Sequence, residues 1–141
     1  MEQETGSRIQ VVLCEPGKKA RVTTIKHDLA SLQRMVGDSY IEAVYPFEDP
    51  VALICDEEGK LNGAELNRSL RDESGKVYDI IAGSFLIVGL GEESFTSLSK
   101  EFQEKYCKMF EYPELFIQRG REIVAVPIRT PEHTVIPKLK R

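Results

Sequence analysis

The most apolar stretch of the sequence is DIIAGSFLIVG, residues 79–89. It is much shorter than the roughly 20 apolar residues that a membrane-spanning helix needs, and no other run in the chain approaches that length. Its Ile, Val and Phe residues favour a β-strand in the interior of a sheet. We therefore predict a central strand here, with Gly83 at a bulge or at a close backbone contact.

Further strands are predicted on both sides of this segment. An apolar run that starts at residue 8 ends at a Pro-Gly turn, and β-branched residues follow, which indicates a hairpin over residues 8–27. Residues 40–49 and 51–56 have strand-like patterns, and so do residues 122–128 near the end of the chain. The chain is therefore predicted to be rich in β-structure.

Two helices are predicted from amphipathic periodicity and capping residues. Asp28 precedes a short run with apolar residues on one face, and Gly37 is suited to end that helix. A second helix is expected over residues 98–109, capped by Thr96 or Ser97. Both patterns place charged side chains opposite the apolar face.

The segment between these elements has no clear period. Residues 60–70, KLNGAELNRSL, contain an Asn-Gly turn signal, and we interpret the rest as a short helix or an irregular strap. Residues 71–78 are expected to form a polar loop.

Together these elements predict an α+β fold, with a mixed or antiparallel sheet of about five to six strands and two main helices. At 141 residues the chain has the length of a single domain. We expect a flexible N-terminus over residues 1–6 and the α+β domain over residues 7–110. Residues 111–141 are expected to hold a C-terminal strand and a basic, Pro-containing tail.

Charge and cysteine content limit the classes of function. The net charge of −4 argues against non-specific nucleic-acid binding, and the basic residues of the tail (Lys138, Lys140 and Arg141) are too few to form a nucleic-acid patch. Three widely spaced cysteines without a C-x-x-C unit favour reduced thiols and a cytoplasmic protein, and the N-terminus lacks a signal-peptide core. Acidic residues gather in turns, where the simplest interpretation is a solvated loop.

No catalytic constellation is evident in the sequence. The only histidines, His27 and His133, lie far apart, so we expect no metal site. Neither Ser84 nor any cysteine has the spacing of an activated nucleophile, and no glycine-rich segment has the spacing of a nucleotide-binding loop. We predict a protein without a cofactor that is not an enzyme.

Two pairs of residues are candidate binding groups. Arg68 could bind a phosphate or carboxylate, with Asn67 supplying a donor and an acceptor beside it. The alternative is structural: Asn67 bonds backbone at a corner of the sheet, and Arg68 pairs with an acid such as Asp79. Tyr45 and Phe47 could anchor a protein interface if they are exposed, although aromatic residues on a strand usually belong to the core.

The order of several motifs resembles a known family. The segments LQRMVGDSYIEAV, CDEEGKL followed by LNR, and IAGSFLIVG are similar in order and spacing to the DUF3846 domain, over roughly residues 8–110. This resemblance implies an accessory protein of a phage or mobile element. It implies no reaction or cofactor, and it directs attention to Asn67, Arg68 and Gly83.

These observations support two hypotheses about function. The first is a non-enzymatic binding module that occupies a host protein, such as a counter-defence protein, through an exposed aromatic patch with an acidic rim. The alternative is a protein that binds a small anionic ligand, a nucleotide or phosphate, through Asn67 and Arg68, either as a sponge or as an enzyme.

Overall fold

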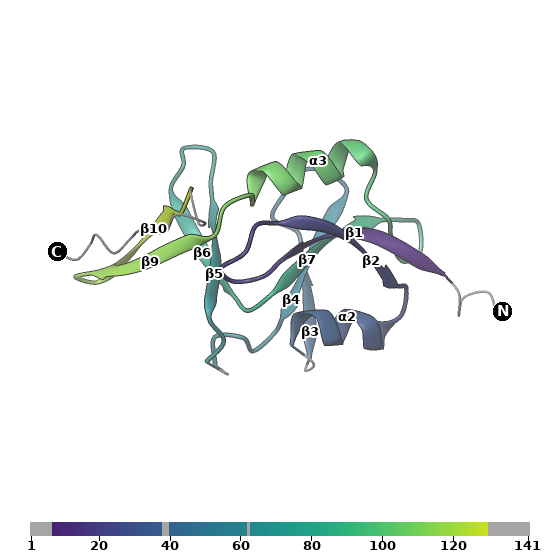
Figure 1. Cartoon of the computed structure of the whole chain (residues 1–141), viewed down its shortest axis with the longest axis horizontal. Helices are drawn as coiled ribbons and strands as arrows, with labels where there is room; N and C mark the ends of the chain where they lie inside the picture. Colours follow the sequence, from purple (N-terminus) through teal and green to yellow (C-terminus); the bar gives the residue numbers. More distant parts are fainter. Residues whose placement is uncertain (1–6, 38–39, 62, 130–141) are drawn as a thin grey trace.

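A six-stranded antiparallel sheet forms the centre of the structure, a computed structural model that describes residues 7–37, 40–61 and 63–129 (Figure 1). Its strands are β1 (Arg8–Cys14), β2 (Arg21–Lys26), β3 (Ile41–Val44), β4 (Val51–Asp56), β7 (Phe85–Leu90) and β8 (Phe95–Thr96). They lie in the order β2-β1-β7-β4-β3, and β8 pairs with β7. The predicted α+β class, with an antiparallel sheet and two helices, is confirmed.

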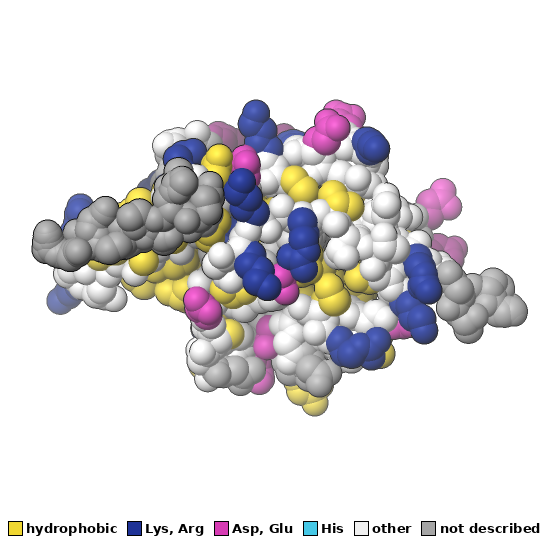
Figure 2. Space-filling view, in the orientation of Figure 1, with side chains coloured by type: hydrophobic (Ala, Val, Ile, Leu, Met, Phe, Trp, Pro, Cys, Tyr) yellow, Lys and Arg dark blue, Asp and Glu magenta, His cyan; other side chains and the backbone are white. Residues whose placement is uncertain are grey.

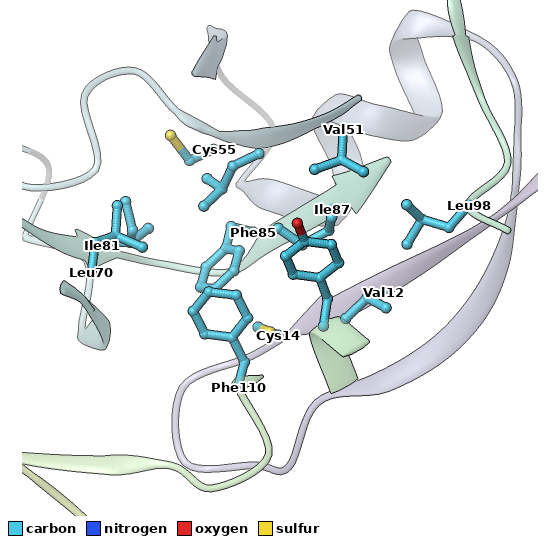
Figure 3. Packing of buried hydrophobic residues seen from close by; sticks show 12 residues of the cluster. Val12, Cys14, Val51, Cys55, Leu70, Ile81, Phe85, Ile87, Leu98 and Phe110 are labelled. Atoms are coloured by element: carbon cyan, nitrogen blue, oxygen red, sulfur yellow. The ribbon is translucent and has the colours of Figure 1, made fainter. Parts of the chain in front are cut away.

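The two helices cover opposite faces of this sheet. The helix α2 (Leu29–Val36) lies on one face, and α3 (Lys100–Met109) lies on the other (Figure 1). β1, β4 and β7 contribute alternate side chains to both layers, so their buried parts, residues 11–14, 51–55 and 85–88, are continuous apolar runs. On the α3 side the rings of Phe85 and Phe110 meet at 5.2 Å between centroids (Figure 3).

Capping residues next to each helix determine where it begins and ends. The Asp28 carboxylate accepts a hydrogen bond from the backbone N–H of Ser31 at 2.7 Å, as expected for an N-cap, and Gly37 ends α2 at a positive φ of 137°. The predicted cap of the second helix was wrong, because Ser99 is its N-cap. Neither helix of the described residues is long and apolar enough to cross a bilayer.

Two hairpins lie outside the main sheet: β5 (Leu66–Arg71) with β6 (Val77–Ala82), and β9 (Glu114–Arg119) with β10 (Glu122–Pro127). The predicted helix or strap over residues 60–70 was wrong, because β5 is a strand. The predicted polar loop over residues 71–78 is shorter, because β6 begins at Val77. The predicted C-terminal strand is confirmed as β10, and its partner β9 was missed.

The apolar segment 79–89 forms two strands, which corrects the prediction of one. β6 ends at Ala82 and β7 begins at Phe85 in a different sheet. Gly83 makes the change of direction with a φ of 85°, and its N–H donates to the Glu65 carbonyl at 2.8 Å. Only glycine adopts this backbone conformation at little cost, so Gly83 is a turn residue and not a bulge within a strand.

Three predicted features fall on residues outside the described ranges. These are the N-terminus over residues 1–6, the Asn62 position of the Asn-Gly turn, and the tail over residues 130–141.

One polar contact joins α3 to the start of β4. The Asp49 carboxylate accepts hydrogen bonds from the Lys105 ammonium at 2.5 Å and from the Tyr106 hydroxyl at 2.7 Å. These two donors hold the pKa of Asp49 below its usual range. Tyr106 is otherwise buried between Phe47 and Phe102, so this contact fixes α3 over the sheet.

We expect Asp49→Asn to lower the melting temperature at neutral pH. Because the folded pKa of Asp49 is depressed, its stabilising effect is complete above the unfolded pKa of about 4 and is lost as the pH falls through the lower folded value. The difference between wild type and Asp49→Asn should therefore shrink below about pH 4. Thermal melts at several pH values test this, with the exposed neighbour Glu48→Gln as the control. A difference that persists unchanged at low pH would contradict the assignment.

Candidate functional site

Asn67 and Arg68 are adjacent residues of β5, and both are buried. Their exposed fractions are 1% and 0%. Neighbours in a strand normally point to opposite faces, but the β5–β6 register shifts between Leu66 and Arg68. This irregularity breaks the alternation and lets both side chains enter the interior.

The guanidinium of Arg68 uses all of its donor groups inside the protein. Nε and Nη2 donate to the carbonyl of Phe110 at 3.1 and 2.9 Å, and Nη2 also donates to the carbonyl of Lys18 at 2.6 Å. Nη1 donates to Asn67, to its side-chain oxygen at 2.8 Å and to its carbonyl at 3.3 Å. These five bonds account for the five N–H groups of an arginine.

The surroundings of Arg68 explain how a cation is tolerated there. Phe110 is the C-cap of α3, and the C-terminal end of a helix carries partial negative charge that favours a cation. Burial lowers the pKa of Arg68, and nearby Cys14 and Glu114 act in the opposite direction. Backbone carbonyls thus take the place of the carboxylate partner that was expected, and Asp79 instead accepts from Lys60 at 3.0 Å.

Asn67 connects two further segments of the chain. Its amide nitrogen donates to the carbonyl of Cys14 at 3.1 Å and to the carbonyl of Gly83 at 2.9 Å. The structural interpretation of Asn67 therefore matches its contacts. With the groups of both side chains engaged in the interior, the predicted anion site at Asn67 and Arg68 has no surface for a ligand to contact.

We expect Arg68→Met to destabilise the fold by about 2–4 kcal/mol, because the carbonyls of Lys18 and Phe110 would lose their buried partner. Arg68→Lys should be less damaging, since it keeps the charge and some donors. The matched control is Arg71→Met, an exposed arginine of the same strand, with an expected loss below about 1 kcal/mol. Urea unfolding measures all three, and equal losses for Arg68→Met and Arg71→Met would contradict the role given to Arg68.

Tyr45 and Phe47 do not form one patch. Tyr45 is 60% exposed, whereas Phe47 is half-buried and packs against Tyr106 with 4.9 Å between ring centroids. The strand ends at Val44, so the two-residue spacing no longer places them on one face. Phe47 therefore belongs to the core, and Tyr45 stays accessible.

Tyr45 lies on a cleft of about 400 Å³ between the β3–β4 pair, the turn after β4, and β6. We call it the tyrosine cleft, because Tyr45 and the 55% exposed Tyr78 both line it. Leu61, 85% exposed, stands at its margin, and apolar side chains such as Val44 and Ile81 line its interior. Sequence reasoning missed Tyr78 because it fell in a predicted loop.

The tyrosine cleft is strongly acidic. Its lining contains one cationic residue, Lys60, and five carboxylate residues. The acids are Glu42, Asp56, Glu57, Glu58 and Asp79. Lys and Arg side chains instead gather over β1 and β2, at the other end of the strand order (Figure 2). The turn acids interpreted as a solvated loop thus border a concave, aromatic surface. Coulomb attraction there favours a cationic ligand.

The ionisable groups of the cleft give no sign of an activated nucleophile. Burial, followed by the charge of Glu42, raises the pKa of the Cys55 thiol to about 11, so this thiol is protonated at neutral pH. Burial also raises the pKa of Cys14 to about 12. Among the residues that the structure describes, no group of three or more His, Cys, Asp or Glu side chains is placed to hold a metal ion.

A hydrophobic surface is also visible away from the cleft. Exposed apolar side chains of the β9–β10 hairpin include Leu115, Ile117 and Val126 (Figure 2).

Comparison with known proteins gives one match. The family described as a domain of unknown function, DUF3846, matches residues 9–111, in agreement with the resemblance seen in the sequence. No curated protein and no solved structure matches the chain significantly. The matched range includes the tyrosine cleft and β5, and it ends before the β9–β10 hairpin.

Proposed function

We propose, from the premise that this chain belongs to the DUF3846 family, that it is a non-enzymatic module that binds a basic segment of a host protein in the tyrosine cleft. The observation that carries the proposal is the combination of two exposed tyrosines with five carboxylates around one concave surface. Tyrosine and arginine are enriched among residues that dominate binding energy at protein interfaces.

The chemistry of the cleft suits a peptide-like partner with arginine or lysine side chains. The tyrosine rings offer faces for cation–π contact with arginine or lysine, and the carboxylates offer charge-assisted hydrogen bonds. Lys60 and Asp79 form an ion pair, with exposed fractions of 58% and 47%, that a partner could displace at small cost. These features support binding by surface complementarity.

The proposal extends to biological role. The resemblance to accessory proteins of phages and mobile elements supports a module that blocks its host partner, as a counter-defence protein does. Occupying a basic surface needs no turnover, which agrees with the protonated thiols at the cleft and in the core.

We expect Tyr45→Ala to weaken binding of the host partner by about tenfold or more, since truncation of an anchoring tyrosine typically costs 2 kcal/mol or more. The paired change Glu57→Lys and Glu58→Lys should weaken it as well, and raised salt should weaken wild-type binding. Affinity capture from lysate of a natural host, with quantitative mass spectrometry, identifies the partner, and titration of the purified partner gives the change in Kd.

Tyr40→Ala is the matched control, because Tyr40 is 71% exposed but does not line the cleft. It should retain the partner as wild type does. Retention of the same host protein by Tyr45→Ala and by the charge-reversed variant, or capture of no host protein, would contradict the proposal.

A further inference from the structure

A second cavity, of about 310 Å³, lies between β5, the C-terminal end of α3 and the Pro46–Phe47 segment. Ser69, between Arg68 and Leu70 in β5, lines it. Ser69 is only 6% exposed, and its hydroxyl has no hydrogen-bond partner among the described residues. Among the described residues, it is the single buried polar side-chain group without a hydrogen-bond partner.

A buried hydroxyl without a partner is unusual, because nearly all buried polar groups are hydrogen-bonded. The backbone N–H of the same residue is satisfied, since it donates to Oε1 of Glu114 at 2.9 Å. Glu114 also lines the cavity, so the cavity holds a carboxylate as well as this hydroxyl. Together these two groups favour a ligand that presents a hydrogen-bond donor.

Arg71 also lines the cavity, but its guanidinium donates to the carbonyls of Gly75 and Ala125 at 3.1 and 3.0 Å. The rest of the wall is apolar and aromatic. Phe47, Leu70 and Phe110 contribute core side chains, and Met109, 49% exposed, stands at the surface. A cavity of about 150 Å³ lined by such groups already accepts a benzene ring. The volume here therefore accommodates one aromatic ring together with a polar substituent.

We infer that this cavity is a binding site for an aromatic ring that carries one hydrogen-bond donor, a phenol or an indole, with Ser69 and Glu114 as its polar contacts. The cavity shares Pro46, Leu70 and Tyr78 with the tyrosine cleft, so the two sites adjoin. On the proposed function, the ring is a tyrosine or tryptophan side chain of the partner that enters beside its basic segment. This last step rests on the proposed function, whereas the site itself does not.

The test uses the purified full-length protein and three small probes: p-cresol, 3-methylindole and toluene. Titrations followed by ¹H–¹⁵N NMR should show saturable shifts at the backbone amides of Ser69 and Phe110. The donor-bearing probe that fits should bind about threefold to tenfold more tightly than toluene, the range that one added hydrogen bond gives. The two donor probes distinguish a phenol from an indole.

Ser69→Ala should remove this preference over toluene without lowering the melting temperature, because the change deletes a hydroxyl that bonds to none of the described residues. Ser31→Ala is the matched control, an equally buried serine on α2, and it should leave the preference unchanged. Absence of saturable binding, equal affinity for toluene, or a preference that survives Ser69→Ala would overturn the inference. Because no host protein is involved, this result is independent of the capture experiment.

Discussion

The arrangement of the elements depends on the hydrogen bonds that the buried guanidinium of Arg68 donates. Its guanidinium joins β5 to the β1–β2 turn at Lys18 and to the end of α3 at Phe110. Asn67 adds bonds to the end of β1 and to the turn at Gly83. Directional hydrogen bonds thus position a two-stranded hairpin that is too small to be stable alone. The hairpin in turn forms one wall of the tyrosine cleft, because β6 carries Tyr78.

The elements that could be predicted are those whose signals are local. Continuous apolar runs predicted β1 and β4, and Asp28 with Gly37 predicted the limits of α2. β5 could not be predicted, because its buried centre is polar and its acceptors are distant in sequence. Arg68 contacts carbonyls 50 and 42 positions away, and Asn67 contacts one 53 positions away. The burial of such residues depends on tertiary contacts, so the hydrophobic pattern of the sequence cannot predict it.

The candidate site was predictable in part for the same reason. Tyr45 was singled out from a predicted strand, and its exposure supports that choice. Phe47 was paired with it on spacing alone, but the end of β3 at Val44 turns its ring towards Tyr106. The acids of residues 56–58 were visible in the sequence as a turn, yet their relation to Tyr78 required the β5–β6 hairpin to be placed. A cleft that forms between two sheets cannot be recognised from the sequence of either sheet alone.

The arrangement of β5 links the anchor to both cavities. Arg68 is fully buried and Leu70 packs into the core on the α3 side, while Ser69 and Leu70 both line the second cavity. The register shift between Leu66 and Arg68 lets both Asn67 and Arg68 enter the interior, and it lies directly before Ser69 in the strand. The same stretch of β5 thus holds a guanidinium with all of its hydrogen-bond partners and, next to it, a hydroxyl with no partner among the described residues.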